Sequence, residues 1–204
     1  MKRFTTMAII FALLFGCGMA SAQVNSTWAR VDADQNGTIF WLGGKLGPSM
    51  VHDFVYTPSN GSVEGDFGYT FKLYKDAFDI IPMIGGIFNP VTSKTINYVP
   101  QLYWYSAYKN HYSELWLVDY MDPNKNSLNT LWILGLERYK VCKYINVGPQ
   151  FEILQDLKAN ENLRTLAGFG IRMPYGKTGT IDLSASRDTK NKVNTGRMTF
   201  IFNL

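Results

Sequence analysis

Apolar and polar residues alternate along most of the chain beyond residue 37, with a period of two. In the segment 179–188, one face carries Ile181 and Leu183, whereas the other carries Asp182 and Ser184. Successive side chains of a β-strand point to opposite faces, so this alternation predicts strands. Clusters of Gly, Asn, Asp, Pro and Lys separate the alternating segments, as turns separate strands. No segment of helical period is long enough to predict a helix.

The alternation divides the chain into about ten strands. We expect these strands at 38–47, 63–75, 77–89, 96–109, 111–122, 127–139, 143–157, 162–175, 179–188 and 195–204. With both ends of the chain on the same side of the sheet, tight turns fall on that side at 75–76, 109–110, 140–142 and 176–178. Outer loops then fall at 48–62, 90–95, 123–126, 158–161 and 189–194. Residues 51–57 could form another strand and 111–122 alternates less cleanly, so about 8 or 12 strands are the alternatives.

The polar face of the strands could contact either the outer solvent or the interior of a barrel. A soluble β-sandwich or barrel exposes its polar face and buries its apolar face. The reverse arrangement, with apolar side chains in lipid, is favoured here because the segments reach the roughly nine to eleven residues that a tilted strand needs to cross a bilayer. Aromatic residues make up 15% of the chain, which is high for a soluble domain. Many lie near segment ends, where an interfacial girdle would lie: Tyr98, Tyr108, Tyr112, Tyr120, Tyr139, Tyr144 and Tyr175.

The end of the sequence, Met198-Thr-Phe-Ile-Phe-Asn-Leu204, places apolar side chains at alternate positions back from the last residue. This segment resembles the terminal strand signal of bacterial outer-membrane β-barrel proteins, with Leu204 where that signal usually has Phe. The resemblance implies an all-β fold, a closed antiparallel up-and-down transmembrane β-barrel, in the bacterial outer membrane. It implies contact with outer-membrane lipids and lipopolysaccharide, and recognition of this strand by the barrel assembly machinery. It identifies no particular family.

Residues 1–22 predict a secretory signal peptide. Lys2 and Arg3 precede a short apolar run, and Ala20-Ser21-Ala22 is a small-residue cleavage site. A lipoprotein signal at residues 14–17 is the alternative. After cleavage, 23–37 would be a polar periplasmic leader and 38–204 the barrel domain.

Removal of the signal peptide changes the charge and the cysteine content. The formal charge falls from +4 to +2, because Lys2 and Arg3 are lost with no acid. We therefore expect no nucleic-acid partner. Cys142 is then the sole cysteine, so no internal disulfide can form.

The polar faces of the later strands supply candidate lumen residues. We expect six charged side chains to share the interior and line it: Glu137, Glu152, Arg164, Arg172, Asp182 and Arg197. A ten-stranded barrel is little wider inside than its own side chains, so opposite charges should meet and pair. Such a network either plugs a structural barrel or lines a narrow solute pore. Wide porins need about sixteen strands, so passage of large solutes is not expected.

The stretch 31–40, VDADQNGTIF, opens like the loop of a calcium-binding EF-hand. Asp32, Asp34 and Asn36 alternate and Gly37 follows, but position twelve of the loop is Gly43 where a bidentate Glu is required. We expect a polar turn before the first strand. A weak calcium site on Asp32, Asp34 and Asn36 is the alternative.

Signs of enzymatic chemistry are few. His111-Tyr112-Ser113-Glu114 places His111 and Ser113 on one face of a strand, where a histidine could activate a hydroxyl. It resembles the His-x-Ser element of outer-membrane lipid A deacylases, although that element lies near the end of an eight-stranded chain. A lipid-modifying hydrolase is therefore one alternative, and a scaffold that binds partners through the loop at 48–62 is another. We expect a non-enzymatic barrel without metal or cofactor, because no zinc cluster, phosphate-cradling loop or nucleotide fingerprint is present.

Overall fold

The computed structural model describes residues 24–74, 77–90, 94–122 and 129–204. They form thirteen strands: β1 (Val24–Asp34), β2 (Gly37–Leu46), β3 (Met50–Thr57), β4 (Ser62–Tyr69), β5 (Phe71–Leu73), β6 (Phe78–Asn89), β7 (Lys94–Tyr108), β8 (His111–Tyr120), β9 (Thr130–Cys142), β10 (Ile145–Asp156), β11 (Glu161–Tyr175), β12 (Gly179–Asp188) and β13 (Asn194–Asn203). Among these residues there is no helix long and apolar enough to cross a membrane.

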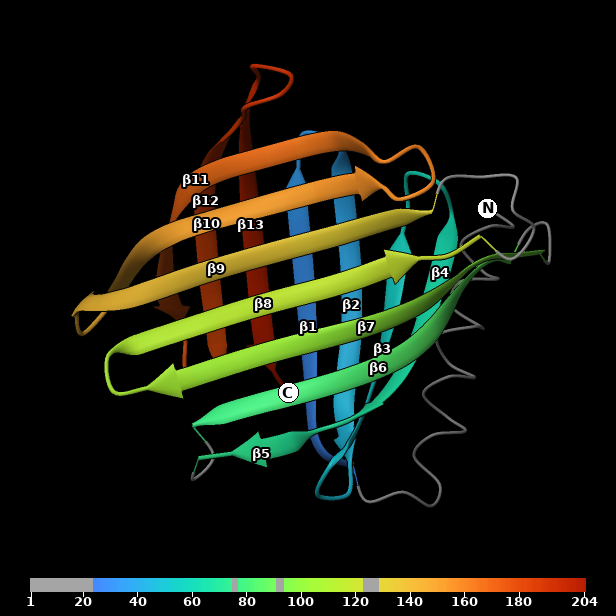
Figure 1. The fold of residues 1–204 in the computed structure, drawn as a ribbon. Helices are drawn as coiled ribbons and strands as arrows, with labels where there is room; N and C mark the ends of the chain where they lie inside the picture. Colours follow the sequence, from blue (N-terminus) through green and yellow to red (C-terminus); the bar gives the residue numbers. More distant parts are fainter. Residues whose placement is uncertain (1–23, 75–76, 91–93, 123–128) are drawn as a thin grey trace, which may run out of the picture.

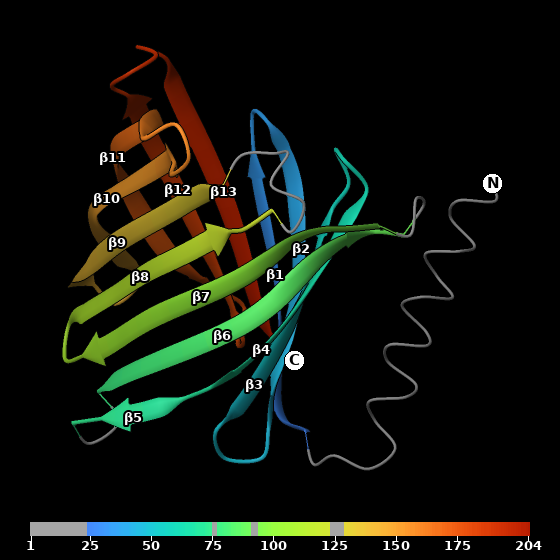
Figure 2. The same cartoon turned by 45° about the vertical axis from the view of Figure 1, so that its right-hand side comes forward.

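The strands form one closed antiparallel sheet. Each pairs with its neighbour in sequence, β1 pairs with β13, and β4 and β5 both pair with β6. Because β4 and β5 are two parts of one strand, interrupted at Thr70, the barrel has twelve strands. In Figures 1 and 2 the inclined strands β6 to β9 lie across the barrel from the more upright β1 and β2. Closure leaves no free sheet edge, which a bilayer requires because lipid cannot satisfy backbone groups.

Two strands account for the difference between the expected ten and the observed twelve. Residues 23–37, expected as a polar leader, contain β1, which pairs with both β2 and β13. The expected outer loop at 48–62 contains β3, the strand left open at 51–57, so it is not the long loop that a scaffold would use. In β1 the inward positions Arg30, Asp32 and Asp34 are charged, and the outward positions between them are the small Ala29, Val31 and Ala33. This strand therefore lacks the large outward side chains that marked the others.

The distribution of apolar and charged side chains is the reverse of a soluble protein. Large apolar side chains are exposed on the outside; Ile84 is 67% exposed and Phe169 is 54% exposed. Charged side chains are buried inside, where Arg138 and Asp66 are each 1% exposed. The expected orientation, with apolar groups toward lipid and charges toward the axis, is the one the structure has.

The chain end and the turns identify the two ends of the barrel. At the end that carries Leu204, whose amide donates to the carbonyl of Thr27, β7 joins β8 through Lys109 and Asn110. Lys109 adopts a φ of 53° there. The turn between β1 and β2, at residues 35–36, lies at the opposite end. The expected signal peptide at 1–22, the turn at 75–76 and the loop at 123–126 lie outside the described residues.

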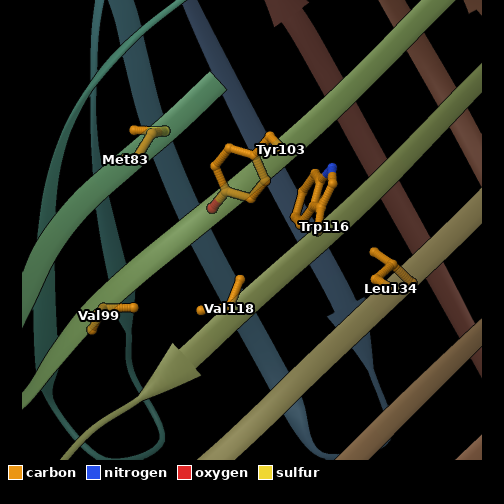
Figure 3. Close-up of a cluster of buried hydrophobic side chains, with 6 residues drawn as sticks. All are labelled: Met83, Val99, Tyr103, Trp116, Val118 and Leu134. Atoms are coloured by element: carbon orange, nitrogen blue, oxygen red, sulfur yellow. The ribbon is translucent and has the colours of Figure 1, made fainter. Parts of the chain in front are cut away.

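An apolar cluster occupies one side of the lumen. Figure 3 shows its buried members on strands β6 to β9: Met83, Val99, Tyr103, Trp116, Val118 and Leu134. The edge of the Trp116 ring meets Trp41 of β2, with ring centroids 5.7 Å apart. Since β2 and β8 are far apart in the sheet order, this contact crosses the interior. The bore is therefore bridged by side chains at this level.

Candidate functional site

Arg138 of β9 is the centre of an ion-paired cluster on one wall of the lumen. Its Nη2 and Nε donate to the two carboxylate oxygens of Asp182 on β12, at 2.8 and 3.1 Å. Its Nη1 donates to the backbone carbonyls of Gly148 and Pro149, each at 3.1 Å. The guanidinium fits because Gly170 has no side chain; a Cβ there would overlap it. Arg138 is the group that uses this space.

The cluster continues through Arg172 to the far side of the barrel. Arg172 donates to Asp182 at 2.9 Å and to Glu114 of β8 at 3.2 Å. Arg30 of β1 pairs with Asp32 at 2.8 Å and lies 3.8 Å from Glu114. Its guanidinium also lies over the face of Trp116, 4.4 Å from the ring centroid. Ion pairs thus link strands from opposite sides of the barrel.

A second ion-paired group lies nearer the end that carries the β1–β2 turn. Glu152 of β10, which is buried, pairs with Arg164 of β11 and with Arg197 of β13. These side chains border a cavity of about 340 Å³. The cavity is also lined by Asp34, Glu64 and residues of the β1–β2 and β3–β4 turns, so it lies at the end of the lumen away from Leu204.

The opposite wall carries carboxylates of a different kind. Asp53 of β3 and Glu64 and Asp66 of β4 point inward and form the acidic triad. Gln101 of β7 donates from Nε2 to Glu64 at 2.9 Å and to Asp66 at 2.6 Å, and Tyr103 donates to the Gln101 carbonyl oxygen. Within the described ranges, no ion pair reaches the acidic triad.

The structure brings five of the six residues expected in the lumen into these groups: Glu152, Arg164, Arg172, Asp182 and Arg197. Glu137 is elsewhere. Its side chain is 47% exposed and accepts a hydrogen bond from the Tyr139 hydroxyl at 2.7 Å. Arg138 occupies the inward position instead, because the inward residues of β9 are even-numbered: Leu134 and Leu136 precede it.

Several interior residues were not expected from the sequence. Arg30, Glu114 and the acidic triad lie on strands whose inward face mixes charge with aromatic and apolar residues. In β8, Trp116 and Val118 share the inward face with Glu114, which hides the alternation. Register against a neighbouring strand would have identified them, since inward residues pair only with inward residues.

The other sequence motifs have structural roles in the described chain. Asp32 pairs with Arg30 and accepts from Thr199, while the Asn36 amide donates to Asp34 at 2.7 Å in the β1–β2 turn. No cluster among the described residues has the geometry to hold a metal ion. His111 stacks on Tyr139, with ring centroids 4.8 Å apart, and its Nε2 lies 3.7 Å from a Glu137 oxygen.

A closed antiparallel barrel with an apolar outside and a charged inside is the architecture of transmembrane β-barrels. Solved bacterial porins share this fold. The KdgM porin in complex with disordered oligogalacturonate has a TM-score of 0.60 and 14% identity, covering 87% of this chain and 98% of its own. The NanC porin has a TM-score of 0.59 and 14% identity, covering 87% of this chain and 100% of its own. A further porin has a TM-score of 0.51 and 10% identity, covering 82% of this chain and 62% of its own.

The sequence matches no protein-family model, and it matches no curated protein. The likeness to the porins is therefore a likeness of fold. It agrees with the resemblance to outer-membrane β-barrels noted in the last strand, and with an even strand count of twelve.

Proposed function

We propose that this chain is a narrow passive channel for small hydrophilic solutes in the bacterial outer membrane. The observation that carries the proposal is the cavity of about 340 Å³, which leads from one end of a lipid-compatible barrel into a polar lumen. The similarity in fold to the KdgM and NanC porins, over nearly the full length of both, supports it. A passive channel needs no catalytic group, and the side chains that line its lumen determine which solutes pass.

The width of the lumen limits what can pass. Barrels of roughly sixteen strands leave an open aqueous channel, and a barrel of twelve strands is narrower. Below the cavity, Trp116 meets Trp41 and Arg30 across the interior, and Trp116 is only 3% exposed. We therefore assign the constriction of the channel to these three side chains. Solutes that pass must be small or must displace them.

The same constriction favours a second reading, in which the side chains plug a structural barrel. The ion pair between Arg30 of β1 and Glu114 of β8, 3.8 Å apart, crosses the lumen and would hold it shut. The channel and the plug differ in one measurable respect, because a plugged barrel passes no current.

The test is conductance in planar lipid bilayers with the refolded full-length mature chain. We expect small unitary steps, which become larger in Trp116→Ala because that change removes an indole from the constriction. Trp104→Ala is the matched control, since Trp104 is 42% exposed on the outer face. Its unitary conductance should equal that of the unmodified chain. Heat-dependent gel migration establishes that each variant is a folded barrel, and folded barrels that pass no current would favour the plug.

Location and partners belong to the same proposal. The exposed apolar belt requires a bilayer, and we propose outer-membrane lipids and lipopolysaccharide as its surroundings. We propose that β13, which ends the chain, is the strand by which the barrel assembly machinery recognises it. Membrane fractionation of the expressing cell tests the location; recovery in the soluble fraction would contradict it.

A further inference from the structure

We propose that the lumen selects cations over anions and that the acidic triad, Asp53, Glu64 and Asp66, determines this selectivity. The inference rests on the proposed channel function and names the class of solute. The preferred solutes would be inorganic cations and small organic molecules that carry an ammonium group.

The arginines of the lumen are already occupied by carboxylates. Five arginines share four acids: Arg30, Arg138, Arg164, Arg172 and Arg197 pair with Asp32, Glu114, Glu152 and Asp182. An anion that entered would have to displace these carboxylates from ion pairs that are largely buried. This group therefore carries a formal charge of only +1 and offers no free row of guanidinium groups.

The acidic triad, in contrast, has no cationic side chain as a partner within the described chain. It contributes three carboxyl groups, and the side chain of another kind that donates to them within the described chain is the neutral amide of Gln101. Asp53 is 4% exposed and Asp66 is 1% exposed, yet Oδ1 of Asp53 and Oδ2 of Asp66 have no hydrogen-bond partner within the described chain. Buried carboxylate oxygens without partners are costly, so these oxygens are sites where a cation would be stabilised.

The position of Glu64 connects the acidic triad to the solute path. Glu64 lines the cavity, together with Asp32, Asp34 and Glu152. A cation in the cavity therefore meets Glu64 before it reaches the constriction. The ion-paired arginine group has an excess of only one positive charge, and the acidic triad places three carboxyl groups on the wall facing it. Low-dielectric walls concentrate the field of such charges and enrich counter-ions in the passage.

A glycine on the neighbouring strand leaves room for one carboxylate of the acidic triad. A Cβ on Gly85 of β6 would overlap the carboxylate of Asp66, so Gly85 preserves the place of that carboxylate on the wall. Gly85 therefore serves Asp66 as Gly170 serves Arg138.

The experiment measures the reversal potential of the full mature chain in planar bilayers under a potassium chloride gradient. We expect potassium to be preferred over chloride by roughly tenfold, the low end of the enrichment that charged clefts produce. In Asp53→Asn/Glu64→Gln/Asp66→Asn the ratio should fall toward unity. Glu137→Gln/Glu161→Gln removes acids outside the lumen, both with exposed side chains, and should leave the ratio unchanged.

A variant of the arginine-bearing wall should shift the ratio in the same direction by a different route. Glu152→Gln releases Arg164 and Arg197 from their shared carboxylate, so its potassium preference should fall below that of the unmodified chain. The single change Glu64→Gln should lower the preference by less than the triple change, and it serves where the triple variant fails to fold.

The outcomes separate the two proposals. A folded barrel that passes no current overturns the channel function, and this inference with it. A barrel that conducts but prefers chloride, or whose ratio is unmoved in the folded Glu64→Gln and triple variants, overturns the inference and leaves the channel function standing.

Discussion

The two walls of the lumen carry charge in different ways. On β9 to β13 and β1, the arginines sit in ion pairs, some of which link strands three places apart in the sheet, as Arg138 links to Asp182. On β3 and β4, the carboxylates of the acidic triad receive only neutral donors in the described chain. Paired charges hold strands together, whereas carboxylates without a cationic partner attract a cation. The first wall is thus suited to stability and the second to solute contact.

This difference also explains the use of glycine on both walls. Gly170 leaves space for the guanidinium of Arg138, and Gly85 leaves space for the carboxylate of Asp66. At these two positions, a charged side chain fits against the wall because the neighbouring strand has no Cβ there. The following variants test whether the arginine wall supplies stability.

The largest effect is expected at Arg138. Arg138→Met removes the partner of Asp182 and leaves a buried carboxylate without its bidentate donor, so the free energy of unfolding should fall by about 3–5 kcal/mol. Equilibrium unfolding in urea from lipid vesicles measures the change. Arg138→Lys keeps the charge but loses the planar fork and should recover only part of the stability.

Arg187→Met is the matched control for Arg138→Met. Arg187 is exposed, and its hydrogen bond to Asn194 is 3.5 Å long. Its loss should change stability by less than about 0.5 kcal/mol. Equal losses at both positions would show that the paired wall is not what stabilises the barrel.

A smaller effect is expected at Gly170. Gly170→Ala places a methyl group against the Arg138 guanidinium and should destabilise the barrel by about 1–3 kcal/mol in the same unfolding assay. Gly196→Ala is the control, because a Cβ there would lie 3.7 Å from its nearest neighbour, the Ser184 carbonyl oxygen. If both variants unfold alike, crowding of Arg138 is not the cause.

The smallest effect is expected outside the lumen. Lys190 and Glu161 form an exposed ion pair of 2.9 Å between two of the turns at the end away from Leu204. Lys190→Met should lower the free energy of unfolding by no more than about 1 kcal/mol, since solvent screens exposed pairs. The loss should shrink further in high salt. A loss as large as that of Arg138→Met would contradict the distinction between buried and exposed pairs.

The sequence was sufficient for the class of fold and for part of the lumen. The period of two, the aromatic segment ends and the last strand predicted a closed transmembrane barrel, and later strands with clean alternation identified Arg172 and Asp182. It was insufficient where the inward face is not polar. On β9, Leu134 and Leu136 face inward beside Arg138, so hydrophobicity alone selected Glu137, which faces out.

The missed strands have a related physical cause. From Ala29 to Asp34, β1 places small residues outward and charged residues inward, so it resembles a polar linker until its pairing with β13 is known. Pairing is a long-range property that alternation in one segment does not contain. The acidic triad was missed for the same reason, because the pairing of β3 with β4 brings its three carboxyl groups together.

The contact of Trp41 with Trp116, and of Trp116 with Trp132 at 5.8 Å, places three indole rings at the narrowest level of the interior. Their emission spectrum therefore reports on the passage itself. Widening would admit water to the buried ring of Trp116 and shift its fluorescence to longer wavelength, so opening could be followed optically in vesicles, with no electrode and no label.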